Sequence, residues 1–202
     1  MTMRPPADGF CDLSDEAMLK YVVVVNANGR SNGTGFATII GGRVYVITNR
    51  HNLAEEIGSF PAEVRNQDFA RTAITGMVAG GRDYADTEGL HFAEDFAVLT
   101  VRDPSILHPL PLLEGRHQGE VVVPSFPDRE YTVTRGLQWF TDDWFDMLDF
   151  PLNMGASGAP VLDCRGYVTG LYTARILPEH WKLAGFKGLA TPISRVLDAM
   201  RK

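Results

Sequence analysis

The chain has little cysteine and no long apolar segment. Only two cysteines, Cys11 and Cys164, occur in 202 residues, whereas a secreted chain of modest size often carries several disulfides. We therefore predict that both are thiols in a reducing compartment. The N-terminal residues lack the basic start, apolar run and small-residue cleavage site of a signal peptide, and no stretch approaches 18 uninterrupted apolar residues. A cytoplasmic location without a membrane partner is expected.

Positive charge is also scarce. Nineteen Lys and Arg residues stand against 25 Asp and Glu residues, which gives a net charge of −6. Such a chain repels a phosphate backbone unless its cations are strongly clustered, and no cluster is visible. Nucleic acid is therefore not an expected partner. With 45% hydrophobic residues, the chain is long enough to fold around a proper core.

Short runs of β-branched and aromatic residues, separated by Gly, Asn and Pro, predict a mainly β protein. The expected strands are 21–26, 34–40, 43–49, 94–101, 119–126, 131–140, 159–163 and 166–174. The first three are expected to be joined by hairpin turns, one of them within residues 28–33. The spacing of the runs is typical of a sandwich or barrel.

The Pro-rich segment 103–115 has no strand pattern and divides the β runs about evenly. We therefore expect an N-terminal lead-in at 1–20, a first β half at 21–103, a connection at 104–118 and a second β half at 119–202. Within the lead-in, Ser14 or Asp15 could cap one helical turn that runs through Lys20.

The C-terminal residues predict one helix. Ile193, Val196, Leu197 and Met200 recur at helical spacing after Pro192. Proline suits the first turn of a helix, and basic residues follow at its end, where the helix dipole favours them.

Three segments carry residues that suit acyl transfer, in the order His, Asp, Ser. His51 follows a predicted strand, Asp95 begins another, and Ser157 lies in the small turn NMGASGAP. Gly155 and Gly158 could expose the serine Oγ and direct the NH groups of Gly155 and Ser157 at one point, as an oxyanion hole requires. Each segment alone fits an ordinary packed histidine or Gly-rich turn, but their order and context favour a joint function.

Together these segments resemble the trypsin-like serine peptidases, and among them the protease domain of the HtrA family. The matching segments span most of the chain: 33–53, 94–101, 119–136, 148–174 and 186–200. The resemblance implies an all-β fold of two six-stranded antiparallel β-barrels with the site between them, followed by the C-terminal helix. No PDZ-like segment follows that helix.

The resemblance also implies roles for individual residues. His51, Asp95 and Ser157 would form the catalytic triad, and the NH groups of Gly155 and Ser157 the oxyanion hole. Tyr172, Thr173 and Ala174 would pair with the substrate backbone, although an ordinary strand is an equal alternative. Pro151 stands six residues before the serine, where members that cleave after Arg or Lys carry an acid. With Leu152 it implies a pocket for small or apolar side chains.

Two positions depart from the family pattern. Ala159 replaces the second glycine of G-x-S-G-G-P, a change of one methyl group that an ordinary backbone region tolerates. Ala156 precedes the serine where trypsin has an aspartate and HtrA an asparagine. The turn must therefore be held in some way other than by the side chain at position 156. An N-terminus freed by cleavage would also find no acidic partner at Ala156, so we expect no such activation.

Other features suggest no further chemistry. His91, His108, His117 and His180 lack the spacing of metal ligands, so surface imidazoles are expected and no metal or other cofactor is implied. The acidic and aromatic segment 137–150 favours a hairpin of the second half over a recognition surface.

The sequence thus predicts a serine endopeptidase that needs no cofactor and acts on a peptide or protein. One alternative is a weakly active or inactive module of the same fold that binds a peptide or protein partner. Another is a viral or defence-associated processing enzyme with one cognate substrate. If Asp95 is not the acid of the triad, Asp83, Asp86 and Asp103 are next in line. The oligomeric state is not predicted.

Overall fold

A computed structural model of the chain describes residues 9–27, 31–53, 62–81, 94–140, 145–180 and 185–202. Five of the sequence predictions fall outside these residues: the turn at 28–30, the roles of Asp83, Asp86 and His91, and the acidic tip at 141–144 of the expected second-half hairpin.

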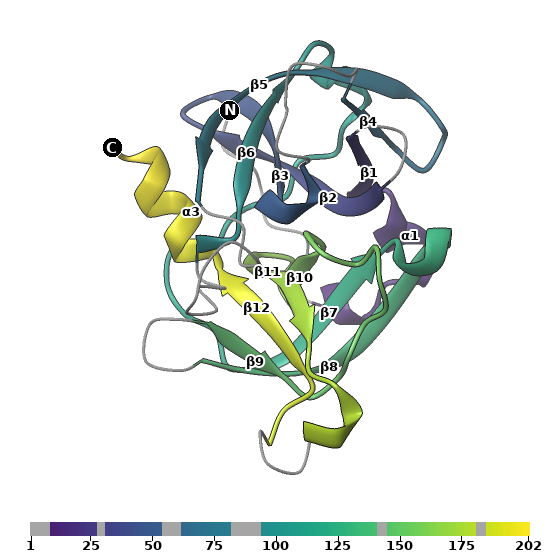
Figure 1. Cartoon of the computed structure of the whole chain (residues 1–202), viewed down its shortest axis with the longest axis vertical. Helices are drawn as coiled ribbons and strands as arrows, with labels where there is room; N and C mark the ends of the chain where they lie inside the picture. Colours follow the sequence, from purple (N-terminus) through teal and green to yellow (C-terminus); the bar gives the residue numbers. More distant parts are fainter. Residues whose placement is uncertain (1–8, 28–30, 54–61, 82–93, 141–144, 181–184) are drawn as a thin grey trace.

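The described residues form two closed antiparallel β-barrels, one above the other in Figure 1. The first contains β1 (Val22–Ala27), β2 (Ser31–Ile40), β3 (Arg43–Thr48), β4 (Glu63–Arg65), β5 (Arg71–Gly80) and β6 (Ala97–Val101), in the order β1-β2-β3-β6-β5-β4. The second contains β7 (Gly119–Ser125), β8 (Thr132–Phe140), β9 (Asp146–Leu148), β10 (Pro160–Asp163), β11 (Val168–Arg175) and β12 (Gly188–Pro192), in the order β10-β11-β12-β9-β8-β7. The predicted all-β fold is confirmed.

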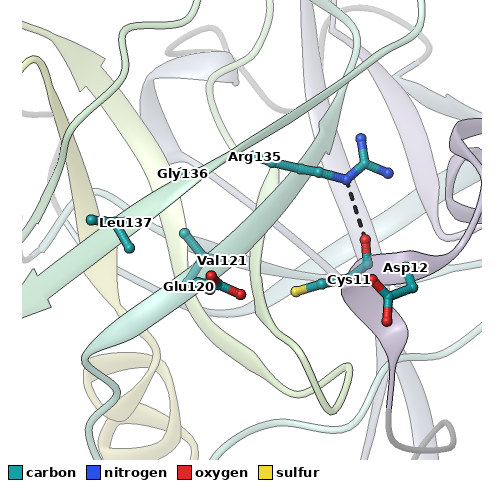
Figure 2. A pocket seen from close by; sticks show the side chains of 7 residues that line it. All are labelled: Cys11, Asp12, Glu120, Val121, Arg135, Gly136 and Leu137. Carbon is teal, nitrogen blue, oxygen red and sulfur yellow. Dashed lines mark hydrogen bonds between the residues drawn. The ribbon is translucent and has the colours of Figure 1, made fainter.

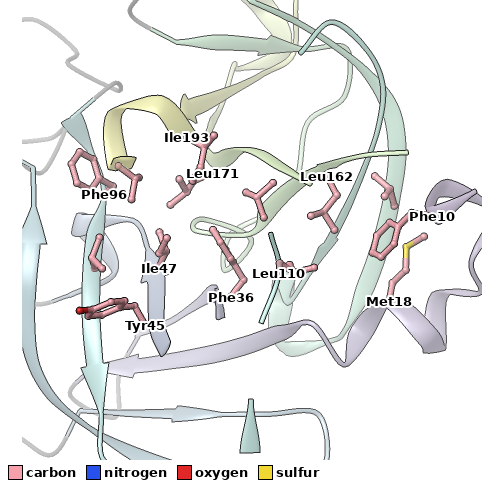
Figure 3. Packing of buried hydrophobic residues seen from close by; sticks show 14 residues of the cluster. Phe10, Met18, Phe36, Tyr45, Ile47, Phe96, Leu110, Leu162, Leu171 and Ile193 are labelled. Atoms are coloured by element: carbon pink, nitrogen blue, oxygen red, sulfur yellow. The ribbon is translucent and has the colours of Figure 1, made fainter. Parts of the chain in front are cut away.

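Three clusters of buried hydrophobic residues hold the barrels together. Val23 and Val25 of β1 pack with Val46 and Leu99 inside the first barrel. A second cluster fills the other barrel. A third lies between the barrels, where Phe36 and Ile47 from the first approach Leu162 and Leu171 from the second (Figure 3). The candidate site is therefore built on two packed, closed sheets.

The connection between the barrels packs against both of them. Leu110 is fully buried, and its NH donates to the Ala37 carbonyl of the first barrel. The Leu113 NH donates to the Val168 carbonyl of the second barrel. The segment is thus hydrogen-bonded to both barrels.

The described part of the N-terminal lead-in, from Gly9 onward, is packed against the barrels. Its short helix α1 (Asp15–Leu19) begins after Ser14, whose side chain accepts a hydrogen bond from the Ala17 NH, as predicted. Phe10 and Met18 are buried in the cluster between the barrels, shown at one end of it in Figure 3. Burial of two such side chains stabilises the fold by about 3–6 kcal/mol.

The prediction of two free thiols is wrong, because Cys11 and Cys164 form a disulfide. The Phe10 NH donates to the Cys164 carbonyl at 2.9 Å, and the Cα atoms of Cys11 and Cys164 lie 4.7 Å apart. That approach depends on tertiary packing across a separation of 153 residues. Because disulfides are typical of oxidising compartments, the cysteine count no longer supports a reducing one.

Arg135 of β8 fastens the same segment to the second barrel. Its guanidinium donates to the carbonyls of Cys11 and Leu13 and to the Asp15 carboxylate at 2.9–3.2 Å. A hollow of about 360 Å³ lies beside these contacts and is shown in Figure 2. It is lined by Cys11, Asp12, Glu120, Val121, Arg135, Gly136 and Leu137.

The predicted C-terminal helix is confirmed as α3 (Ile193–Met200). Ile193 and Val196 are buried against both barrels, and Pro192 stands just before the first turn. No helix among the described residues is long and apolar enough to cross a membrane.

Candidate active site

His51 and Asp95 meet at one end of the first barrel. His51 lies in a 3₁₀ turn (Arg50–Asn52) directly after β3, and Asp95 stands just before β6. The His51 Nδ1 lies 2.6 Å from Asp95 Oδ2, and the His51 NH donates to Asp95 Oδ1 at 3.1 Å. Asp95 is fully buried. Because an ionised carboxylate only accepts hydrogen bonds, this contact selects the tautomer with the proton on Nδ1, which leaves Nε2 to act as a base.

Asn49 links this pair to the second barrel. It is fully buried, and its Nδ2 donates to the Asp95 carbonyl at 2.5 Å and to Thr173 Oγ1 at 3.1 Å. Thr173 belongs to β11 of the second barrel, so the Asn49 side-chain amide links the two barrels next to Asp95. The Asn49 Oδ1 is buried without a hydrogen-bond partner among the described residues.

Ser157 lies in a tight turn on the second barrel that approaches the first. Gly155 and Gly158 on either side of it have φ values of 93° and 87°, which side chains rarely adopt. A Cβ on Gly158 would also collide with the Thr34 carbonyl and Thr48 Oγ1. Glycine at position 158 therefore allows the turn that bears Ser157 to reach the first barrel.

The polar atoms of Ser157 have defined surroundings. Its Oγ donates to the Thr173 carbonyl at 3.3 Å. Its carbonyl accepts from the Thr34 NH at 2.9 Å and from Asn52 Nδ2 at 2.7 Å. Within the described part of the chain, no acceptor is seen for the NH groups of Gly155 and Ser157.

The predicted substrate-binding residues fall into two groups. Tyr172 is buried, and its backbone NH and carbonyl are bonded to Ala159 and Gly158. Thr173 and Ala174 continue β11 beyond the residues that pair with β10, which end at Leu171. Thr173 and Ala174 therefore lie on a part of β11 that β10 does not cover.

Tyr172 acts on the segment that precedes the nucleophile. Its hydroxyl accepts from the Leu152 NH at 2.8 Å and donates to the Leu152 carbonyl at 3.3 Å. Burial raises the pKa of Tyr172 to about 12, so the phenol stays protonated. Leu152 is buried beside it, whereas Pro151 is exposed. Asp149, the acid nearest to Pro151 in the sequence, accepts a hydrogen bond from the Leu137 NH at 2.8 Å.

The other sequence candidates lie apart from these contacts. Asp103 caps a 3₁₀ turn in the connection, and its hydrogen bonds with Ser105 hold its pKa below the usual value. His108 and His180 are exposed, and His117 Nε2 contacts the Glu120 carbonyl. No group of three or more His, Cys, Asp or Glu residues in the described part of the chain could hold a metal.

The sequence did not indicate the residues that connect the segments. Thr34, Asn49 and Asn52 are buried and bond directly to the turns that bear Ser157 or Asp95. Two of them flank His51 in the segment TNRHN, where polar residues beside a buried strand end are the available signal. Their partners could not be identified without the fold.

Comparison with solved structures gives the same architecture. The serine endoprotease from Yersinia pestis matches with a TM-score of 0.68 and 23% identity, over 94% of this chain and 66% of that one. An inactive form of Rv3671c from M. tuberculosis H37Rv, a serine-to-alanine mutant, matches with a TM-score of 0.63 and 19% identity, over 99% of this chain and 95% of that one. Identities this low support the fold alone.

Sequence comparison identifies the family. No curated protein is a significant sequence match. The family model of the trypsin-like peptidase domain matches residues 33–171, which is well over half of the chain and includes His51, Asp95 and Ser157. The chain therefore belongs to the trypsin-like peptidase family.

Proposed function

We propose that the protein is a serine endopeptidase with His51, Asp95 and Ser157 as its catalytic residues. The observation that carries the proposal is the 2.6 Å contact between His51 Nδ1 and the fully buried Asp95 carboxylate. A buried carboxylate that binds this nitrogen holds the imidazole in the tautomer a general base requires. Membership of the trypsin-like peptidase family supports a peptide or protein as the substrate.

The proposed reaction proceeds through an acyl-enzyme. Ser157 Oγ turns away from the Thr173 carbonyl and attacks the scissile carbonyl carbon, while its proton passes to His51 Nε2. The NH groups of Gly155 and Ser157 stabilise the oxyanion. The tetrahedral intermediate then expels the amine, which takes the proton from His51. Water, deprotonated by His51, releases the acid product and restores Ser157.

The substrate would bind as an added strand along β11. Thr173 and Ala174 extend beyond the end of β10, and the Thr173 carbonyl could accept from the substrate once Ser157 Oγ leaves it. Such pairing provides affinity with little sequence selectivity. Tyr172 would contribute indirectly, because its hydroxyl holds the Leu152 backbone.

We expect small or apolar side chains before the cleaved bond. Leu152 and Tyr172 are buried and apolar, and Asp149 is already bonded to the Leu137 NH. A substrate ammonium or guanidinium in such a pocket would lose several kcal/mol for want of a partner. A peptide-library profile checks this expectation, and a preference for Arg or Lys would contradict it.

Labelling with a fluorophosphonate tests the function. The wild type should be modified at Ser157, as located by mass spectrometry, Ser157→Ala should not react, and His51→Ala should react far more slowly. Ser105→Ala removes an exposed serine in the connection and is the control that should label normally. Modification of another residue would refute the assignment.

The alternative is a module that binds a peptide or protein without cleaving it. It is favoured by one observation, the hydrogen bond from Ser157 Oγ to the Thr173 carbonyl, which occupies the nucleophile. A wild type that binds peptides but neither labels nor hydrolyses them would support this alternative over the peptidase.

A further inference from the structure

The turn that precedes Ser157 is held without help from the side chain at position 156. Ala156 is fully buried and has no polar side-chain atom. Gly155 has the wide conformational freedom of glycine and adopts a φ of 93°. The Ala156 NH donates within the turn to the Asn153 carbonyl, and further hydrogen bonds reach the turn from elsewhere in the molecule.

Thr34 of β2 makes two hydrogen bonds through its hydroxyl, one to this turn and one to the segment that begins at Phe126. Its side chain is fully buried, and Oγ1 donates to the Gly155 carbonyl at 2.7 Å. The same oxygen accepts from the Phe126 NH at 3.0 Å. The hydroxyl therefore joins the first barrel to two separate segments of the second barrel.

The backbone of Thr34 holds the other side of the turn. Its NH donates to the Ser157 carbonyl at 2.9 Å, and its own carbonyl accepts from Thr48 Oγ1 at 2.7 Å. One residue thus bonds to the carbonyls of both Gly155 and Ser157, the two residues whose NH groups are the proposed oxyanion donors.

The segment that begins at Phe126 completes the restraint. Two residues after Phe126, the Asp128 NH donates to the Met154 carbonyl at 2.8 Å. Because a trans peptide is planar, fixing the Met154 carbonyl also fixes the direction of the Gly155 NH. By binding Phe126, Thr34 anchors the segment that sets this direction, and it fixes the next peptide plane directly at the Gly155 carbonyl.

We propose that Thr34 is a positioning residue that orders the oxyanion turn, in the role that a polar side chain at position 156 would otherwise fill. The proposal rests on the proposed peptidase function and assigns the support of its oxyanion donors to a first-barrel hydroxyl. The oxyanion develops only during the reaction, and the ordered turn would bind it there. Loss of the Thr34 hydroxyl should therefore reduce kcat and leave KM nearly unchanged.

Matched threonine variants test the proposal. Thr34→Val keeps the side-chain shape and removes the hydroxyl, whereas Thr34→Ser keeps the hydroxyl. Thr38→Val is the control, because Thr38 is an equally buried threonine of β2 whose hydroxyl donates to the Leu110 carbonyl in the connection. We expect kcat to fall about 10²-fold in Thr34→Val, the scale for loss of one oxyanion donor. Thr34→Ser and Thr38→Val should stay within about threefold of the wild type.

Two kinetic outcomes would overturn the assignment. One is a Thr34→Val variant that keeps the kcat of the wild type. The other is an equal fall in kcat for Thr34→Val and Thr38→Val, because a general loss of packing would affect both.

Hydrogen exchange gives a readout that does not depend on activity. The Ala156, Gly158 and Ala159 NH groups donate within the turn or to Tyr172. Exchange in a peptide that covers 153–159 should therefore be faster in Thr34→Val than in the wild type and Thr38→Val. Unchanged exchange would refute the positioning role. If Thr34→Val does not fold, Thr34→Ala also lacks the hydroxyl and is judged by the same exchange measurement.

The two proposals can fail separately. Absence of fluorophosphonate labelling of the wild-type Ser157 would refute the peptidase, while faster exchange in Thr34→Val would still support the ordering of the turn. Normal labelling of the wild type with unchanged kcat and exchange in Thr34→Val would refute only the role of Thr34.

Discussion

The two barrels share a topology but differ in what fills them. The cluster inside the first barrel consists of aliphatic side chains, among them Val25, Val46 and Leu99. Inside the second barrel, Thr169 Oγ1 donates to Gln138 Oε1 at 2.7 Å, and Gln138 Nε2 donates to Asp146 Oδ2 at 2.7 Å. The cluster inside the first barrel is thus purely aliphatic, whereas the second barrel also encloses a chain of hydrogen-bonded polar side chains.

The polar chain of the second barrel contains a carboxyl whose pKa is strongly shifted. Burial raises the pKa of Asp146 to about 7, although the Gln138 hydrogen bond and the charge of Arg116 lower it. The cluster inside the first barrel contains no titratable side chain, and Asp95 lies outside it, against His51. The first barrel therefore contributes the hydrogen-bonded pair of His51 and Asp95, and the second contributes a buried carboxyl whose protonation depends on pH.

The largest expected effect concerns the contact between His51 and Asp95 in the first barrel. Asp95→Asn should leave the fold intact, because the amide fills the same space, but it stabilises the wrong imidazole tautomer. Turnover should fall about 10⁴-fold. Steady-state kinetics and thermal unfolding measure the two quantities. Asp103→Asn, at an exposed carboxyl in the connection, is the control that should keep turnover. A loss below about tenfold would show that another acid serves His51.

A smaller effect concerns the disulfide that fastens the N-terminal segment to the second barrel. Replacing Cys11 and Cys164 by alanine should lower the free energy of unfolding by about 2–5 kcal/mol. Hydrogen exchange should rise more in β7 and β8, which the segment covers, than in β2 and β3.

Reduction provides the control for this comparison. A reductant should destabilise the wild type and leave the double alanine variant unchanged. Equal unfolding free energies for reduced and oxidised wild type would contradict the stabilising role, and equal exchange in both barrels would contradict its assignment to the second barrel.

The smallest effect concerns Asp146 and appears only above its unfolded pKa. Between about pH 4 and pH 7 the folded protein retains a proton that the unfolded chain has released, so stability falls as pH rises and levels off above pH 7. Asp146→Asn removes this penalty and keeps an oxygen that can accept from Gln138.

Denaturant unfolding measured across pH checks this expectation. The variant should be more stable than the wild type at pH 8 by about 4 kcal/mol at most, and nearly equal to it at pH 3. Asp198→Asn, at an exposed position of α3, is a control without such a pH-dependent gain. A wild type whose stability rises from pH 4 to pH 7 would contradict the buried protonated carboxyl.

Local signals predicted much of the fold. The run of valines in β1, the cap at Ser14 and the helical spacing of Ile193 and Val196 depend on residues near one another in the chain, so they could be interpreted directly. The strands β4 and β5 were not assigned individually. Strand β4 is only three residues long. Strand β5 contains glycine and bulges, which interrupt the alternation of apolar and polar residues along it.

For the candidate site, the sequence indicated the main residues but not the residues that hold them in place. The order of His51, Asp95 and Ser157 is visible in the sequence, and the structure brings the first two into contact. The role of Thr34 was not visible, because its partner Gly155 is 121 residues away. The disulfide was missed for the same reason, since neither cysteine has a local sequence signal that identifies its partner.

The disulfide also constrains the order in which the chain can mature. A ribosome makes the N-terminal segment first, yet Cys11 has to wait for Cys164, which is synthesised 153 residues later. Phe10 and Met18 are likewise made long before Leu162 and Leu171, with which they share a cluster. The first barrel can form while the second is still being translated. The segment that carries Phe10, Cys11 and Met18 is therefore made before either barrel and reaches its final place only when the second barrel is complete.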